Sequence, residues 1–263
     1  MSKRVIITGA ASGIGAATAK ALRDRGAAVV GLDLKEGDDV IACNVTDQTS
    51  VDRAVAEAVQ RLGGLDALVN CAGIGLPQSA GDRPGPDALR VLDVNLLGTW
   101  RTTAAALPAL RASHGRVVNI SSGLAHIAVP FATAYGASKR AVVGYSEQLR
   151  AEVGDEITVT TVYPGYIRTP IHDASRNAGV GLEGMVPAEP LEAAVATLVR
   201  AIYGKPVRDL ATTKRGGRAY AALRFIPKGL VERAIRRQMR AGAKRGAFES
   251  TPMTSDLIAR LNR

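Results

Sequence analysis

Two residues near the middle of the chain, Tyr135 and Lys139, have the side-chain types and the spacing that acid–base chemistry needs. They lie four positions apart in a segment with helical periodicity, so their side chains share one helix face. A free tyrosine titrates near pH ~10, and a cation held beside it favours the phenolate. We therefore expect Lys139 to lower the pKa of Tyr135. Such a phenol can exchange a proton with an alcohol or carbonyl oxygen.

The N-terminal segment suits binding of a dinucleotide. A β-rich run at 3–7 leads into Thr8-Gly9-Ala10-Ala11-Ser12-Gly13-Ile14-Gly15, and a helical pattern follows at 16–25. Glycines in such a turn let the backbone approach a diphosphate, and the helix N-terminus offers unpaired N–H groups to its charge. A second strand at 27–33 ends at Asp33. The glycine spacing differs from the GxGxxG fingerprint, so the prediction depends on the strand–turn–helix context.

Strand and helix patterns alternate along the chain. Alternation of this kind predicts an α/β fold, a doubly wound parallel (Rossmann) sheet with helices on both faces. We place this domain at 1–205 and treat 206–263 as a basic helical extension of the same domain. Further strands are expected at 40–43, 66–70, 116–120, 157–163 and 207–211, and further helices at 48–62, 86–111, 133–153, 187–203 and 228–243.

Six segments, in this order, resemble the short-chain dehydrogenase/reductase family. They are Thr8 to Gly15, Asn70-Cys71-Ala72-Gly73, Val94 to Gly98, Asn119 to Ser122, Tyr135 to Lys139, and Tyr163-Pro164-Gly165 through Thr169. The resemblance implies that Tyr135 is the general acid/base, that Lys139 also binds the nicotinamide ribose, and that Ser122 holds the substrate oxygen. Asn95 would order a water that links Lys139 to solvent, or it would only bridge backbone groups.

The same resemblance implies a cofactor site along the carboxyl ends of the strands, where ligands of such sheets bind. Asn70 could again serve only the backbone of its strand. The predicted cofactor-binding residues are Gly9, Ser12, Gly13, Ile14, Gly15, Asp33, Asn44, Val45, Asn70, Ala72, Gly73, Tyr135, Lys139, Pro164, Gly165, Ile167 and Thr169.

Asp33 indicates NAD as the cofactor. A carboxylate at the end of the second strand accepts hydrogen bonds from the adenosine ribose and repels the 2′-phosphate of NADP. Ser12 stands where relatives that prefer NADP often carry Arg or Lys. Lys35 is an opposing signal because it can pair with a phosphate, so NADP remains the alternative. Relatives often have Asp at the position of Asn44, which leaves the adenine contacts open.

The predicted activity is the NAD-dependent interconversion of a secondary alcohol and a ketone on a hydrophobic, steroid-like or lipid-like substrate. Apolar residues and glycines alternate over 171–186, which is typical of a lid over an apolar ligand. The alternatives are an NADP-dependent carbonyl or 3-oxoacyl reductase, and a nucleotide-sensing protein that keeps the fold without turnover.

We expect a cytoplasmic protein. Lys3 and Arg4 lead directly into the first strand, no apolar run reaches roughly 18 residues, and Cys43 and Cys71 are too few for a disulfide framework. The three histidines lack the spacing of metal ligands, so we expect no metal. The resemblance also implies a homodimer or homotetramer that pairs the outer faces of helices 86–111 and 133–153. The apolar surface expected there is Ala104, Ala105, Ala106, Ala141, Val142 and Tyr145.

The basic character of the chain is concentrated near its C-terminus. Residues 200–247 hold 14 of the 34 Lys and Arg residues but 2 of the 24 Asp and Glu residues. The helix expected at 228–243 has one apolar face, formed by Leu230, Val231, Ala234, Ile235 and Met239. We expect this face to pack beside the lid or across a subunit interface. Peripheral contact with an anionic membrane is the alternative, and the absence of interleaved aromatic residues speaks against nucleic acid.

Overall fold

The computed structural model describes residues 2–181, 187–212, 227–244, 254–255 and 258–259. The described strands form a seven-stranded parallel sheet in the order β3-β2-β1-β4-β5-β6-β7, which confirms the doubly wound α/β prediction. The strand order reverses between β1 and β4, and ligands bind at such a switch point. The strands are β1 (Arg4–Thr8), β2 (Ala28–Asp33), β3 (Val40–Ala42), β4 (Ala67–Asn70), β5 (Arg116–Ile120), β6 (Thr158–Tyr163) and β7 (Asp209–Ala211).

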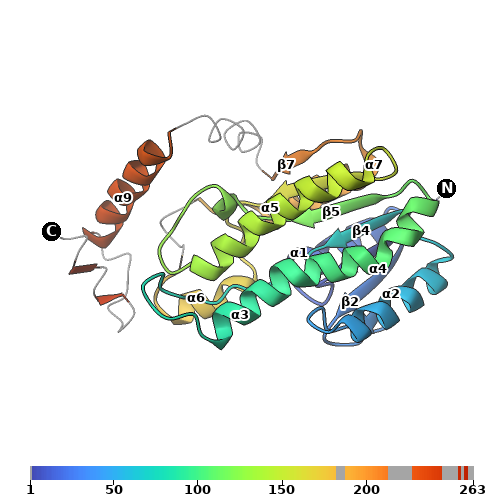
Figure 1. Cartoon of the computed structure of the whole chain (residues 1–263), viewed down its shortest axis with the longest axis horizontal. Helices are drawn as coiled ribbons and strands as arrows, with labels where there is room; N and C mark the ends of the chain where they lie inside the picture. The colour runs from blue at the N-terminus through green and yellow to red at the C-terminus, as the bar shows by residue number, and fades with distance from the viewer. Residues whose placement is uncertain (1, 182–186, 213–226, 245–253, 256–257, 260–263) are drawn as a thin grey trace.

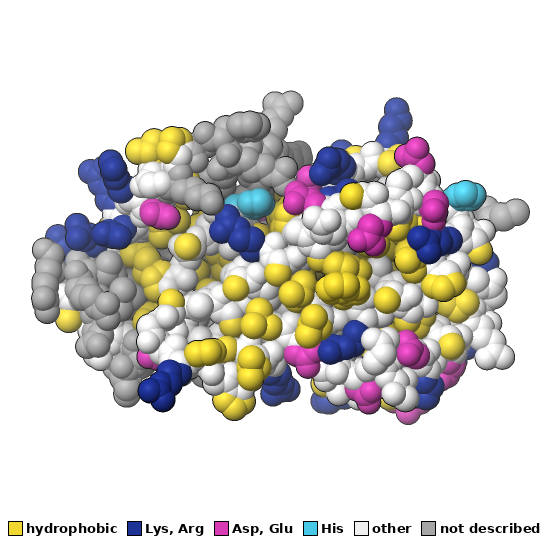
Figure 2. Space-filling view, viewed as in Figure 1, with side chains coloured by type: hydrophobic (Ala, Val, Ile, Leu, Met, Phe, Trp, Pro, Cys, Tyr) yellow, Lys and Arg dark blue, Asp and Glu magenta, His cyan; other side chains and the backbone are white. Residues whose placement is uncertain are grey.

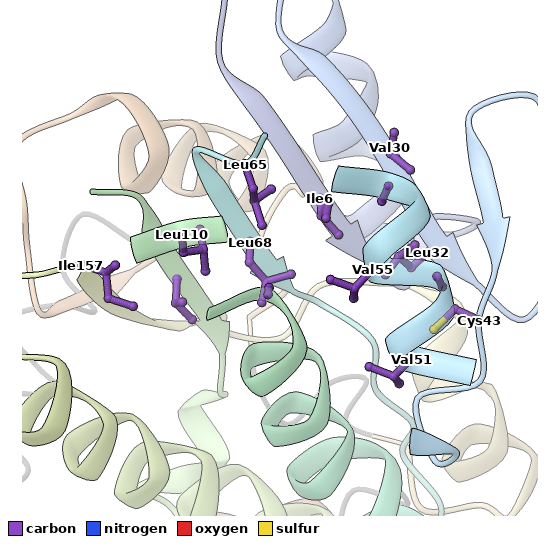
Figure 3. Close-up of a cluster of buried hydrophobic side chains, with 14 of the residues drawn as sticks. Ile6, Val30, Leu32, Cys43, Val51, Val55, Leu65, Leu68, Leu110 and Ile157 are labelled. Atoms are coloured by element: carbon purple, nitrogen blue, oxygen red, sulfur yellow. The ribbon is translucent and has the colours of Figure 1, made fainter. Parts of the chain in front are cut away.

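Helices cover both faces of this sheet (Figure 1). The helices α1 (Gly13–Arg23) and α7 (Leu191–Tyr203) pack together on one face, and α2 (Gln48–Leu62), α4 (Gly98–Ala112) and α5 (Thr133–Val153) lie on the other. Successive strand side chains point to opposite faces, so Val5 and Ile7 join the α1/α7 core while Ile6 joins the other core. Figure 3 shows Ile6 and Leu68 from the sheet with Val55 and Leu110 from the helices in that second core.

The long helix expected at 86–111 is interrupted in the structure. It consists of α3 (Pro86–Leu92), a π-helical turn at Asp93–Leu97, and α4. π-helical turns often occur at functional sites, and this one contains Asn95, whose side chain is fully buried. The seventh helix starts at Leu191 rather than at 187, because Pro190 is its extended N-cap residue.

Part of the predicted oligomer surface is buried within the subunit. Ala106 and Val142 are completely inaccessible, because they face the sheet rather than solvent, so those two assignments are corrected. The outer face of α4 and α5 carries a ring pair instead: Trp100 is 55% exposed and its ring centroid lies 5.4 Å from that of Tyr145. Hydrophobic side chains gather at the centre of this face, where α4 and α5 run across the molecule (Figures 1 and 2).

The basic C-terminal helix is α9 (Lys228–Lys244), and part of its apolar face packs against a residue near the end of the chain. Met239, Ile235 and Ala243 pack against Ile258 near the end of the chain, while Leu230 remains 54% exposed. The C-terminal half of the apolar face is therefore covered by the following segment. In the parts of the chain that the structure describes, no helix combines the length and apolar character needed to span a bilayer.

Candidate active site

A deep cavity of about 1530 Å³ opens at the carboxyl ends of the strands. Ligand pockets usually measure about 300–1,000 Å³, so this cavity has room for a dinucleotide together with a second, smaller ligand. Every residue predicted for catalysis or cofactor binding lines it except Asn70 and Asn95. The positions converge because four of the six segments lie at the carboxyl ends of β1, β4, β5 and β6, which share one edge of the sheet, while the other two lie on helices beside it.

Tyr135 and Lys139 project from the first turns of α5 into this cavity. The ammonium nitrogen of Lys139 lies 5.7 Å from the centroid of the Tyr135 ring, as the four-residue spacing predicts. It donates a hydrogen bond of 3.0 Å to the backbone carbonyl of Ile120 at the end of β5. Lys139 is only 3% exposed, and this bond holds its buried side chain between the phenol and the sheet.

Ser122 lies directly after β5 and faces the phenol. Its hydroxyl accepts a 3.2 Å hydrogen bond from the backbone N–H of Leu124 and is also hydrogen-bonded to Tyr135. The neighbouring Ser121 donates instead to the backbone carbonyl of Lys139 at 2.8 Å, so its hydroxyl is occupied by α5. The two serines therefore divide their roles: Ser121 ties α5 to the sheet, and Ser122 is placed beside the phenol.

Burial controls the protonation of the phenol and the ammonium. It raises the pKa of Tyr135 above its ordinary value, and the hydrogen bond with Ser122 opposes this shift. Burial also lowers the pKa of Lys139 to about 8. The lowered pKa of Tyr135 that the sequence predicts does not appear in this structure, because burial is the largest influence on the phenol. At neutral pH Tyr135 is a neutral phenol, the form that donates a proton.

Asn95 holds the backbone around the site. Its side-chain Oδ1 accepts from the N–H of Ile74 at 2.8 Å, and its Nδ2 donates to the carbonyl of Ile74 and to Ser138 Oγ, both at 3.0 Å. The amide thus clamps the segment after β4 to the first turns of α5. No described side chain bridges Asn95 and Lys139, although both approach Gly73. This geometry favours the backbone-bridging role that the sequence left open.

Asn70 belongs to a buried polar cluster beneath the cavity. Its Nδ2 donates to Thr103 Oγ1 at 2.9 Å and to Asn119 Oδ1 at 2.8 Å, and its Oδ1 accepts from Thr102 Oγ1 at 2.6 Å. Asn119 continues the cluster to Ser146 at 2.9 Å. Since the three hydrogen bonds of the Asn70 amide go to α4 and β5, and Asn70 does not line the cavity, its side chain is not directed at a cofactor. It joins β4 to its neighbours and positions the loop that follows.

The first turn of the fold forms a tight backbone cradle. Gly9 and Gly13 have left-handed φ angles of 68° and 52°. A Cβ at Gly9 would lie 2.8 Å from the Cα of Ala72, and one at Gly15 would collide with the carbonyl oxygen of Gly9. The N–H groups at the start of α1 face the same cavity without a side-chain cap from Ser12. This arrangement fits a diphosphate, since its charge is compatible with a helix N-terminus.

Asp33 and Asn44 line the cavity next to the ends of β2 and β3. The carboxylate of Asp33 accepts hydrogen bonds from the backbone N–H groups of Ala11 at 2.9 Å and Leu34 at 2.8 Å. Both bonds hold the carboxylate beside the glycine turn. Asn44 Oδ1 accepts from the N–H and the hydroxyl of Thr46, so its amide supports the loop that carries Val45.

The segment after β6 closes the cavity on the side of Ser122. The N–H of Gly123 donates to the carbonyl of Pro164 at 2.9 Å, which brings Gly165, Ile167 and Thr169 to the rim. Sequence reasoning missed Glu189 here. Its carboxylate accepts from Thr212 Oγ1 and occupies the space that a side chain at position 165 would need. The Pro164-Gly165 pair carries no signal for this partner, because Glu189 lies far along the chain.

The wall beside Tyr135 is apolar. Leu124, Ile127 and Val129, from the loop between Ser122 and α5, line it together with Ile171. That loop was not predicted to line the site, although its apolar residues between two site residues were a usable signal. Of the predicted lid, Pro170–His172 forms a 3₁₀ turn and Asp173–Asn177 forms α6, whereas Leu182, Met185 and Val186 lie outside the described residues. Across the described ranges, His, Cys, Asp and Glu side chains form no cluster able to hold a metal ion.

The chain is similar to known proteins over much of its length. The family model described as short chain dehydrogenase matches residues 3–179. The chain is 38% identical to the short-chain reductase protein NovJ of Streptomyces niveus over 188 residues, which cover 64% of this chain and 70% of NovJ. It is 32% identical to the 3-oxoacyl-(acyl-carrier-protein) reductase FabG of Thermotoga maritima over 221 residues, 78% of this chain and 85% of FabG.

A solved structure is also similar to this chain. The 3-ketoacyl-(acyl-carrier-protein) reductase from Brucella melitensis, complexed with NADH, superposes with a TM-score of 0.69 at 25% identity and covers 80% of this chain and 95% of its own. The family match extends from β1 past Thr169 and so includes every residue predicted for the site. The chain therefore belongs to the short-chain dehydrogenase/reductase family of oxidoreductases.

Proposed function

We propose that this protein interconverts a secondary alcohol and a ketone, with Tyr135 as the acid/base and a nicotinamide dinucleotide as the hydride carrier. The observation that supports this most strongly is that Ser122, Tyr135 and Lys139 line the same cavity as the glycine cradle of the first turn. The cofactor, when bound, supplies or accepts the hydride. The residues of the chain orient the substrate and move the proton.

The proton path follows from the three side chains. Ser122 holds the substrate oxygen, and Tyr135 donates its phenolic proton to that oxygen as the ketone becomes an alcohol, or accepts it in the reverse direction. Lys139, which carries its proton below its pKa of about 8, stabilises the phenolate left by the donation. Asn95 acts as a positioning residue through its clamp on Ile74.

We propose NAD rather than NADP as the cofactor. The support is the fixed carboxylate of Asp33, held by two backbone N–H groups where a ribose would bind. A 2′-phosphate there would meet a negative charge. Direct titration should give tighter binding of NADH than of NADPH, and Asp33→Ala should weaken NADH while improving NADPH. A wild-type protein that binds NADPH more tightly would instead support the alternative, an NADP-dependent carbonyl or 3-oxoacyl reductase. The name of the Thermotoga relative supports the 3-oxoacyl reductase activity in that alternative.

We propose a hydrophobic substrate, because Leu124, Ile127, Val129 and Ile171 surround the space beside the phenol. A turnover screen of hydrophobic alcohols and ketones against short polar ones, with both cofactors, tests this. Activity confined to charged or sugar substrates would overturn the substrate class. Cofactor binding without turnover of any alcohol or ketone would favour a nucleotide-sensing protein.

We also propose a homodimer or homotetramer formed through the outer faces of α4 and α5. The support is the exposed Trp100–Tyr145 pair on that face. The division of the chain near residue 205, the cytoplasmic location and the absence of nucleic acid as a partner remain predictions. Peripheral membrane contact is a separate proposal that depends on α9.

A further inference from the structure

The helix α9 carries a continuous basic face. Arg233, Arg236, Arg237, Arg240 and Lys244 recur at spacings of three and four residues, so they lie on one side of the helix. All five are exposed. Figure 2 shows Lys and Arg side chains gathered over α9 at the left end of the molecule. The acidic residue of α9, Glu232, lies four residues before Arg236 and borders this stripe, so five cations and one carboxylate give this side of the helix a charge of about +4 at neutral pH.

These cations have no carboxylate partner in the described part of the chain. Elsewhere the described arginines commonly pair, as in Arg4 with Asp66 at 2.8 Å and Arg101 with Asp93 at 2.7 Å. None of the eight ion pairs in the described ranges involves α9. Five like charges on one helix face repel one another, so an external anion would stabilise this face.

An exposed apolar edge borders the basic face. Leu230 is 54% exposed and, by helical geometry, lies one turn from Arg233 and Ala234. The opposite face of α9 is occupied, because Ile235 and Met239 pack against Ile258. The helix therefore offers solvent a basic stripe with one large apolar side chain at its margin.

We propose that α9 binds an anionic phospholipid surface, with the five cations on the headgroups and Leu230 inserted at the level of the acyl boundary. Polybasic segments gain affinity from each Lys or Arg near such a surface, and apolar side chains add to it. A nucleic acid would also attract the charges, but α9 has no aromatic side chain on which a base could stack. An exposed leucine is unnecessary for phosphate contacts, whereas it suits the interface of a bilayer.

Vesicle flotation of the full-length protein tests this proposal. Wild type should float with phosphatidylcholine vesicles that contain phosphatidylglycerol, should not float with phosphatidylcholine alone, and should be released by salt. Combining Arg233→Gln, Arg236→Gln and Arg237→Gln should weaken binding roughly 100-fold, since each charge contributes several-fold. The matched control neutralises three exposed cations elsewhere, Arg25→Gln, Arg83→Gln and Lys205→Gln, and should bind like wild type.

Leu230→Ser separates lipid from nucleic acid. It should weaken vesicle binding by about tenfold and leave the salt dependence unchanged, because it removes an inserted apolar side chain. Circular dichroism and NADH titration should be normal for each variant, which distinguishes a lost surface from a misfolded chain. Equal binding to both vesicle types, an equal loss in the control variant, or duplex DNA that binds more tightly than anionic vesicles would each overturn the proposal.

Discussion

Replacing Asn95 with alanine distinguishes a structural clamp from a proton relay. The variant leaves the N–H and the carbonyl of Ile74 without their partner, whereas Ser138 Oγ keeps its bond to the carbonyl of Tyr135. A buried group left without a partner costs about 1–3 kcal/mol. Ile74 is partly exposed, so water can reach some of this backbone. We therefore expect a loss of about 2–4 kcal/mol in the free energy of unfolding.

Urea denaturation followed by far-ultraviolet circular dichroism measures this loss. The matched control is Asn44→Ala, because the Asn44 amide serves the exposed backbone and hydroxyl of Thr46, and water can replace it there. The control should lose at most about 1 kcal/mol. If Asn95→Ala unfolds within about 0.5 kcal/mol of wild type while turnover is lost, the clamp is not the main role of the residue and the relay assignment replaces it.

Three further perturbations follow from the same geometry. Lys139 has a folded pKa of about 8 against an ordinary value of 10.5, so the unfolded chain binds more protons than the folded chain between those two pH values. The free energy of unfolding of wild type should therefore rise with pH across this window relative to Lys139→Met, by up to roughly 1.4 kcal/mol per pH unit. Urea midpoints of the two proteins that stay parallel across the window would contradict this prediction. Gly15→Ala places a methyl group against the carbonyl of Gly9 and should weaken NADH binding about tenfold to 100-fold. The control Gly144→Ala, whose added methyl group meets open space, should bind NADH normally. Equal NADH affinities of the two variants would contradict the assignment of the glycine turn as a cofactor cradle. Trp100→Glu should lower the mass measured by light scattering to that of a monomer, and an unchanged mass would place the interface elsewhere.

Local signals in the sequence were sufficient for much of the fold. The helix α2 has the predicted bounds because both ends carry readable caps: Asp47 accepts from the N–H groups of Thr49 and Ser50, and Gly63 adopts φ 67° just past the last turn. The positions of Ser122, Tyr135 and Lys139 also followed from spacing, because a helix fixes i and i+4 on one face and parallel strands end at one edge.

Other features depend on neighbours that the sequence does not reveal. The π-helical turn at Asp93–Leu97 goes with the bonds of Asn95 to Ile74, a partner 21 residues away. The direction of the Tyr135 pKa shift depends on how much protein surrounds the ring, and spacing carries no information about burial. Asn70 matched a family motif, yet its amide is used by Thr102, Thr103 and Asn119.

The contacts of the C-terminal helix α9 also depend on residues that its own sequence does not reveal. Helical periodicity predicted α9 correctly but placed Leu230 on the apolar face with Ile235 and Met239, whereas Leu230 lies at the margin of the basic stripe. It could not identify what covers the apolar face. The structure gives that place to Ile258, a residue beyond the helix, and leaves Leu230 exposed.

The most direct test of the account is the turnover of Tyr135→Phe set against its cofactor affinity. The phenylalanine keeps the ring in the cavity wall and removes only the hydroxyl that gives and takes the proton. Once a substrate has been found, the variant should lose turnover by ~10²–10⁴-fold and bind NADH as tightly as wild type. Turnover within a few-fold of wild type, with NADH binding intact, would contradict the assignment of Tyr135 as the acid/base.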